Sequence, residues 1–185
     1  MRTLSTFFLL LVFSSQINAQ SIEDEAVVWL SEFIQVDTIN PPGNESRAVD
    51  YYAKIFDAEG IEWESAESAP GRGNIWARLK GGDEPALMLL QHTDVVPADL
   101  EYWTTDPLSG ELRDGYILGR GARDMKGTGI SHLAAFLSLH RSGRPLNRDV
   151  IFVASADEEA GGAFGVGWLI ENRPEIFEGV GLLLN

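Results

Sequence analysis

The sequence contains no cysteine. A disulfide framework, a thiolate zinc site and a cysteine nucleophile are therefore all excluded. Basic residues are also scarce, since 14 Lys and Arg stand against 28 Asp and Glu and leave a formal net charge of -14. Because so acidic a surface repels phosphate, we expect neither nucleic acid nor an anionic membrane as a partner.

Long hydrophobic runs are missing except at the start of the chain. Residues 4–13 are almost entirely apolar, they follow a positively charged Arg2, and residues 14–20 include a small-residue cleavage pattern that ends at Ala19. The apolar run is about half of the ~20 residues that a membrane-spanning helix needs. We therefore expect residues 1–19 to be a cleaved signal peptide rather than an anchor, and the mature chain to be periplasmic or secreted.

The remaining residues 20–185 alternate between helical and strand-like patterns. The spacing of apolar residues predicts helices over residues 21–35, 44–59, 127–141 and 165–172, strands over residues 61–66, 74–79, 86–91, 149–156 and 180–184, and a hairpin over residues 110–118. Asn44 is expected to cap the second helix at its start, and Gly60 to end it in a left-handed conformation. Such alternation predicts an α/β fold with a mostly parallel sheet flanked by helices.

The predicted strand at residues 180–184 is continuously apolar, so we expect it to be buried inside the sheet. The printed sequence stops one residue later, at Asn185. A sheet rarely ends on a central strand without a following element, so we expect further residues after Asn185 and regard residues 20–185 as a truncated domain.

Three acidic clusters carry most of the functional information. They are His92 with Asp94, Asp124 in a glycine-rich turn, and Glu158 with Glu159. The first and third follow predicted strands, and ligands of α/β sheets bind beyond the carboxyl ends of the strands. Imidazole and carboxylates are ligands that zinc accepts. Since residues i and i+2 of an extended segment point to the same side, Asp94 can reach the ring of His92 and orient it.

Each cluster also has an ordinary interpretation when it is considered alone. His92 can be a surface histidine and Asp94 the cap of a turn, Asp124 can be the N-cap of the following helix, and Glu158 and Glu159 can form a solvated acidic turn. Their joint placement favours a metal site with a hydrolytic use, in which one glutamate binds metal and the other acts as a general base.

The segments HTDVVPA, GRGARDMKG and ADEEAGG, with PPGNE upstream, resemble the zinc-dependent aminoacylase and carboxypeptidase family of metallopeptidases, which includes glutamate carboxypeptidase, acetylornithine deacetylase and succinyl-diaminopimelate desuccinylase. The resemblance covers about residues 22–185. It implies the amino-terminal part of a dinuclear-zinc exopeptidase-like catalytic domain. It also implies that the family's lid domain, through which a homodimer can form, is absent from residues 20–185.

The resemblance further implies the roles of the site residues. His92 would bind one zinc ion, Glu159 would bind a second, and Asp124 would bridge the two, with Co²⁺ or Mn²⁺ as possible substitutes. The catalytic residues would be Glu158, as general base, and Asp94, which would orient His92. The peptide bond after Asp124 would be cis. The substrate would be an N-acyl amino acid or a small peptide, hydrolysed at an amide bond.

Two alternatives remain open at this point. One is a non-catalytic metal-binding domain of the same fold. The other is a glycosidase that uses Glu158 with Asp124 or Asp94 as a carboxylate pair, which leaves His92 without a role. Since the proposed ligands supply each zinc ion with two groups rather than the usual three, we expect an acidic ligand soon after residue 185 and a distant histidine. We also expect the 185-residue chain to bind metal weakly and to lack hydrolytic activity by itself.

Overall fold

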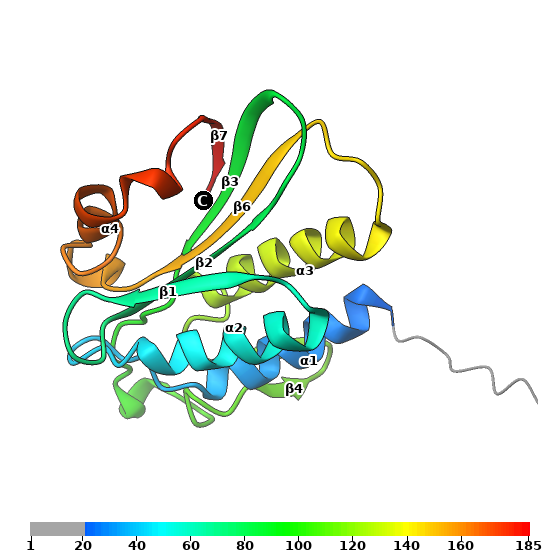
Figure 1. Cartoon of the computed structure of the whole chain (residues 1–185). Coiled ribbons are helices and arrows are strands. Elements are labelled where there is room, and N and C mark those ends of the chain that lie inside the picture. The colour runs from blue at the N-terminus through cyan, green and yellow to red at the C-terminus, as the bar shows by residue number, and fades with distance from the viewer. Residues whose placement is uncertain (1–20) are drawn as a thin grey trace, which may run out of the picture.

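The computed structural model describes residues 21–185, so the expected signal peptide at residues 1–19 lies outside the described residues. One five-stranded sheet, in the order β1-β2-β6-β3-β7, forms the centre of the molecule (Figure 1). Helices α1, α2 and α3 cover one face of the sheet, and α4 lies on the other face. The predicted α/β fold is confirmed. None of the helices within residues 21–185 combines the length and the apolar character that crossing a bilayer requires.

The predicted elements are found close to their expected positions, with ends that differ by a few residues at most. The helices are α1 (Ile22–Gln35), α2 (Ser46–Glu59), α3 (Lys126–Ser142) and α4 (Val166–Asn172), and the strands are β1 (Trp63–Glu67), β2 (Gly73–Leu79), β3 (Glu84–His92), β4 (Glu111–Arg113), β5 (Tyr116–Leu118), β6 (Arg148–Ser155) and β7 (Val180–Leu184). Between residues 21 and 185, three short 3-10 helices lie in the connections, namely η1 (Leu100–Tyr102), η2 (Glu158–Ala160) and η3 (Pro174–Ile176).

The sheet is mixed, with a parallel part at its centre. Strand β3 pairs in parallel with both β6 and β7, whereas β2 pairs antiparallel with β1 and β6. The register of β3 and β6 places His92 opposite Ser155. Both strands therefore end at the same level of the sheet, and the residues that follow them enter the same region of space.

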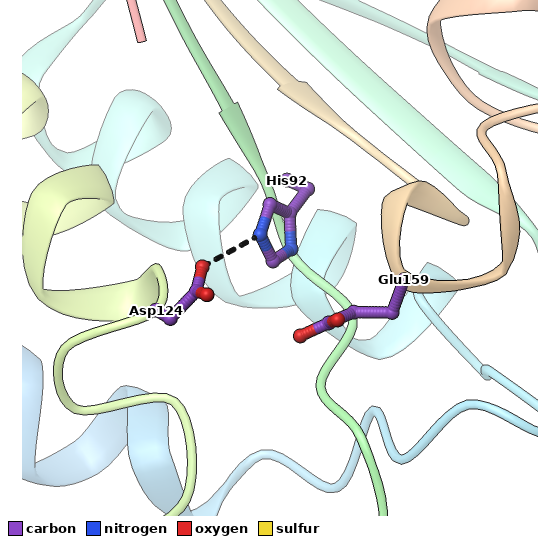
Figure 2. Close-up of side chains that lie close together, drawn as sticks. All are labelled: His92, Asp124 and Glu159. Atoms are coloured by element: carbon purple, nitrogen blue, oxygen red, sulfur yellow. Dashed lines mark hydrogen bonds and ion pairs between the residues drawn. The ribbon is translucent and has the colours of Figure 1, made fainter.

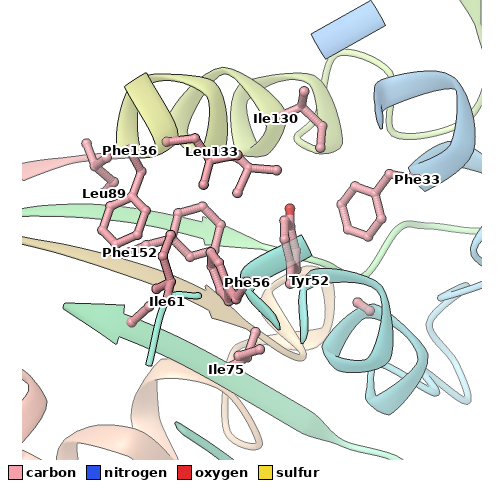
Figure 3. Packing of buried hydrophobic residues seen from close by; sticks show 14 of the residues in the cluster. Phe33, Tyr52, Phe56, Ile61, Ile75, Leu89, Ile130, Leu133, Phe136 and Phe152 are labelled. Atoms are coloured by element: carbon pink, nitrogen blue, oxygen red, sulfur yellow. The ribbon is translucent and has the colours of Figure 1, made fainter. Parts of the chain in front are cut away.

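Strand β6 explains why helices can pack on both faces of the sheet. Its side chains alternate, so that Phe152 belongs to the core beneath α1, α2 and α3 while Ile151 and Val153 belong to the core beneath α4. The ring of Phe152 lies 5.2 Å from Tyr52, 5.4 Å from Phe56 and 5.7 Å from Phe136, measured between centroids (Figure 3). Aromatic packing of this kind holds α2 and α3 against the sheet, and α3 begins next to the functional site.

Of the two caps predicted for α2, the one at its end is confirmed and the one at its start is wrong. Gly60 ends the helix with a φ of 67°, as predicted. Asn44 does not cap its start, because it has a φ of 65°, whereas a side-chain N-cap takes an extended backbone. The helix instead begins at Ser46, after Glu45, whose side chain is buried and paired elsewhere.

The expectation that residues 180–184 are buried was wrong. Within the described part of the chain β7 pairs with β3 alone and forms an edge of the sheet. Leu182, Leu183 and Leu184 are 52%, 51% and 53% exposed. An apolar run indicates a strand with two apolar faces, but whether those faces are covered depends on neighbouring elements that the run itself does not specify.

Candidate metal centre

Three of the predicted site residues come together at the carboxyl ends of β3 and β6. His92 is the last residue of β3, Asp124 lies in the turn before α3, and Glu159 lies in η2 after β6. Each offers one ligand atom, and these atoms all lie within 4.8 Å of one another (Figure 2). His92 Nε2 is 3.2 Å from Asp124 Oδ1. The predicted convergence of these side chains is confirmed.

The turn before α3 directs Asp124 toward His92. The Asp124–Met125 peptide bond is cis, as the family resemblance implied. Met125 rather than Asp124 is the N-cap residue of α3, and no side chain among residues 21–185 caps this helix, so the interpretation of Asp124 as an N-cap was wrong. The main-chain N–H of His92 donates to Met125 Sδ at 3.3 Å, and Lys126 Nζ donates to the carbonyl oxygen of Phe33 at 2.9 Å. These contacts tie the start of α3 to the ends of β3 and α1.

The imidazole of His92 is oriented by Asp94, although not in the way the sequence suggested. The nearest partner of Nδ1 is the main-chain carbonyl oxygen of Asp94 at 2.9 Å, while the Asp94 carboxylate lies 3.4 Å away. When Nδ1–H donates to this carbonyl, the neutral ring presents Nε2 as its coordinating nitrogen. Nε2 is the atom that lies near Asp124 and, at 3.7 Å, near Glu158 Oε2.

The Asp94 carboxylate is fully buried and connects His92 to the turn that carries both glutamates. It accepts hydrogen bonds from the main-chain N–H groups of Glu158, at 3.0 Å, and of Glu159, at 3.1 Å. Asn40 Nδ2 donates a third, at 2.7 Å. Burial by itself would raise the pKa of Asp94, but the adjacent His92 imidazole and the hydrogen bond from Asn40 hold it below its usual value. Asp94 is therefore an anion that fixes the turn and the imidazole together.

The charges at this site suit a divalent cation. Burial would lower the pKa of His92, but the hydrogen bond and charge of Asp94, together with Asp124, raise it to about 9. Burial raises the pKa of Glu159, and the negative charges of Asp124, Asp94 and Glu158 raise it further against the opposing effect of His92. Carboxylates crowded around one imidazole nitrogen favour a positive charge between them. The donor set, one imidazole and two carboxylates, fits zinc or a similar divalent ion.

We expect the variant Asp94→Ala to bind a divalent cation about 10–100-fold more weakly than the wild-type protein, the usual effect of removing a group that orients metal ligands. The reason is that the main chain of Glu158 and Glu159 loses its buried acceptor. Titration with Co²⁺ followed by visible absorption would measure the affinity, and circular dichroism would confirm folding. A folded variant with wild-type affinity would contradict this function of Asp94.

The sequence pattern of peptidase family M20/M25/M40 matches residues 88–183. This stretch begins within β3, ends within β7 and contains all five predicted site residues. The chain belongs to this family. The resemblance seen in the three acidic motifs is therefore confirmed at the level of the family.

Named relatives of several kinds are similar to this chain over most of its length. Aminoacylase-1 of Sus scrofa is 32% identical over 157 residues, which cover 83% of this chain and 38% of the relative. Succinyl-diaminopimelate desuccinylase of Methylorubrum populi is 37% identical over 132 residues, or 68% of this chain and 33% of the relative. Human carnosine dipeptidase 1 superposes with a TM-score of 0.70 at 26% identity, covering 87% of this chain and 38% of that structure. The chain thus spans 33–38% of the length of these relatives.

Sequence reasoning missed several polar residues behind the site. Asn40, Glu45 and Arg72 were given no function, and Asp157 was included only as part of the ADEEAGG segment. All four are buried. The PPGNE segment gave a weak indication of Asn40 and Glu45, because polar residues flank its two prolines. Arg72 lies in an ordinary glycine-rich loop, and no local sequence pattern indicates that it is buried next to the site.

Proposed function

We propose that the protein hydrolyses an amide bond in an N-acyl amino acid or a small peptide, and that the reaction requires divalent cations. The observation that carries this proposal is the convergence of His92, Asp124 and Glu159 with Glu158 beside them, in a chain of peptidase family M20/M25/M40. Relatives named as an aminoacylase, a desuccinylase and a dipeptidase support the same class of substrate.

His92, Asp124 and Glu159 would hold the cations, two zinc ions if Asp124 is shared between them, with Co²⁺ or Mn²⁺ accepted by the same oxygen-rich donors. When bound, such cations polarise a carbonyl oxygen and lower the pKa of water. His92 can take this role because the carbonyl of Asp94 holds its Nδ1 and leaves Nε2 directed toward Asp124.

Glu158 is the residue placed to transfer protons. Its side chain is 62% exposed, and its Oε2 lies 3.7 Å from His92 Nε2. Glu158 would accept a proton from the attacking water while the new carbon–oxygen bond forms, and would pass it to the amide nitrogen as the carbon–nitrogen bond breaks. Its main-chain N–H donates to the buried Asp94 carboxylate, which limits the positions that the side chain can take.

The two rival functions differ from this proposal in ways that can be measured. A carboxylate-pair glycosidase has little support, because Asp94 is completely buried and accepts three hydrogen bonds, so it cannot reach a sugar. A glycosidase that pairs Glu158 with Asp124 would need no metal. A non-catalytic metal-binding domain would bind cations and hydrolyse nothing.

The natural full-length protein should hydrolyse members of a panel of N-acyl amino acids and dipeptides, and a chelator should abolish this activity. Adding Zn²⁺, Co²⁺ or Mn²⁺ after removal of the chelator should restore it. Release of free amine, followed with a primary-amine reagent, measures the rate. Hydrolysis that survives complete removal of metal would contradict the proposed reaction. Stoichiometric metal with no hydrolysis of any panel member would favour the non-catalytic alternative.

A further inference from the structure

Four polar side chains form a buried group directly behind the candidate metal centre. Asn40, Glu45, Arg72 and Asp157 are 6%, 0%, 8% and 3% exposed. They come from the loop after α1, the residue before α2, the residue before β2 and the second residue after β6. We call them the buried quartet. Segments that lie far apart in the sequence are thus joined at one point beneath the site.

The guanidinium of Arg72 is the centre of the buried quartet. Nη2 lies 2.5 Å from Asp157 Oδ1 and 2.9 Å from Glu45 Oε1. Nη1 donates to Asn40 Oδ1 at 3.3 Å and to the carbonyl oxygen of Pro42 at 2.9 Å. The planar fork of an arginine allows one side chain to hold several acceptors in fixed directions at once, which a lysine cannot do.

Asn40 extends these contacts to the metal centre. Its Nδ2 donates to Asp94 Oδ2 at 2.7 Å and to Asp157 Oδ1 at 3.3 Å. Asp94 in turn accepts from the main-chain N–H groups of Glu158 and Glu159. A continuous series of hydrogen bonds therefore runs from Arg72 through Asn40 and Asp94 to the two glutamates.

Asp157 gives Arg72 a second and shorter connection to the same turn. It immediately precedes Glu158 and has a φ of 68°, a left-handed conformation that is uncommon for any residue except glycine. Its side chain is held on one oxygen by Arg72 and on the other by the N–H of Phe164 at 2.9 Å. Its own N–H donates to Glu45 Oε1 at 3.2 Å. These contacts fix the backbone conformation from which Glu158 and Glu159 project.

The loop before α2 is packed closely around Arg72. A Cβ atom added to Gly43 would lie 2.7 Å from Arg72 Cζ and 2.6 Å from Glu45 Oε2, and the φ of Gly43 is 106°. Glycine is therefore required there by both space and conformation. The guanidinium also stacks on the ring of Phe164, with Cζ 5.3 Å from the centroid. Arg72 consequently has little freedom to adopt another position.

The composition of this region is unfavourable if stability is its only purpose. Arg72 is surrounded by the carboxylates of Glu45 and Asp157, and the Asp94 carboxylate lies one hydrogen bond further away. Burying charged groups is costly, and well-packed apolar residues of similar volume often give equal or greater stability. The free-energy cost of burying these charged groups is understandable if the buried quartet sets the geometry of the adjacent metal centre.

We propose that Arg72, acting with Asn40, is a positioning residue that sets the turn at residues 157–159 and so directs Glu158 and Glu159 into the metal centre. This inference rests on the proposed function for the part that concerns turnover. Within residues 21–185, Arg72 makes no hydrogen bond or ion pair with Glu158 or with the three proposed metal ligands. It acts through Asp157 on one side and through Asn40 and Asp94 on the other.

The first test is Arg72→Lys in the natural full-length protein. Lysine keeps the positive charge but cannot hold Asp157, Glu45 and Asn40 together. Co²⁺ affinity should fall about 10–100-fold, and kcat should fall by a similar factor while KM stays within about threefold. The control is Arg78→Lys, because Arg78 makes a comparable fork to Asp149, at 2.9 Å, and to the Ile176 carbonyl, at 3.1 Å, but has no contact with the metal centre. It should leave both quantities unchanged.

A second comparison separates positioning from a general loss of structure. In a Glu158→Gln background assayed at saturating Co²⁺, adding Arg72→Lys should lower the residual rate much less than it lowers the wild-type rate, because the base that Arg72 positions has already been removed and the metal sites are kept filled. A loss that multiplies in the double variant would overturn the proposal. If Arg72→Lys does not fold, Asn40→Ala tests the same series of contacts while leaving the ion pairs of Arg72 in place, and it too should weaken Co²⁺ binding.

Wild-type Co²⁺ affinity in a folded Arg72→Lys variant, or an equal loss in Arg78→Lys, would overturn the positioning role. Failure of the proposed function has a different signature, which is a wild-type protein that hydrolyses no substrate. In that case the Co²⁺ titrations of the Arg72 and Arg78 variants still decide whether Arg72 positions the metal-binding turn.

Discussion

Replacing Glu158 by glutamine should lower kcat by about 10²–10⁴-fold, the usual contribution of a general base, while the metal content remains close to that of the wild-type protein. Glutamine keeps the size of the side chain and loses the group that accepts a proton. The side chain is 62% exposed, so the substitution should leave the fold intact. Steady-state kinetics and metal analysis of the purified protein would measure the two effects separately.

Glu171→Gln is a suitable control, because Glu171 is an exposed glutamate on α4. It should retain full activity and full metal content. Wild-type turnover in Glu158→Gln would mean that another group is the base. A simultaneous loss of metal would mean that Glu158 is a ligand, and the functions proposed for Glu158 and Glu159 would have to be exchanged.

Asp124→Asn should weaken the binding of divalent cations by more than about 100-fold and reduce hydrolysis below detection. If Asp124 is shared between two ions, as we propose, its carboxylate contributes to both, and a neutral amide cannot replace it. Asp124 is well suited to this test because its side chain is 79% exposed, in contrast to His92 at 4%. The loss of metal binding should therefore occur with little change in stability.

Calorimetric titration with Zn²⁺ and thermal melting in a chelator would measure affinity and stability of the Asp124→Asn variant. Asp83→Asn, at an exposed position in the turn before β3, provides the matched control and should behave as wild type. If Asp124→Asn bound Zn²⁺ as tightly as the wild-type protein, the closeness of Asp124 to His92 would have to be explained without a metal.

Local patterns in the sequence were sufficient to predict most of the fold. The apolar run that became β6 packs on both faces of the sheet, as the absence of polar alternation indicated. The hairpin over residues 110–118, which turns at Asp114-Gly115 between β4 and β5, and the left-handed Gly60 were also predicted, since the conformation of turn residues depends mainly on themselves and their neighbours. The failed prediction for Asn44 shows the limit, because Glu45, which is paired with the distant Arg72, takes the N-cap position of α2 instead.

Part of the candidate site could also be predicted from the sequence, because it depends on where the predicted strands end. His92 and Glu159 each follow a predicted strand, and strand ends in a parallel sheet share one edge, so their proximity followed from the predicted fold. Asp124 could be added because its motif occurs in a known family. The contact of His92 with the main-chain carbonyl of Asp94 could not be predicted, since it depends on the path of the backbone after β3.

The sequence by itself thus determined the helices and strands, their alternation along the chain, and the edge of the sheet at which the acidic clusters meet. These features depend on local periodicity. Only the tertiary structure showed that Arg72 lies between Asn40 and Asp157, which are 32 and 85 positions away from it, and that β7 is an exposed edge among residues 21–185. Contacts over such separations depend on how whole elements pack together. A loop arginine and an apolar run carry no local sign of which neighbours will surround them.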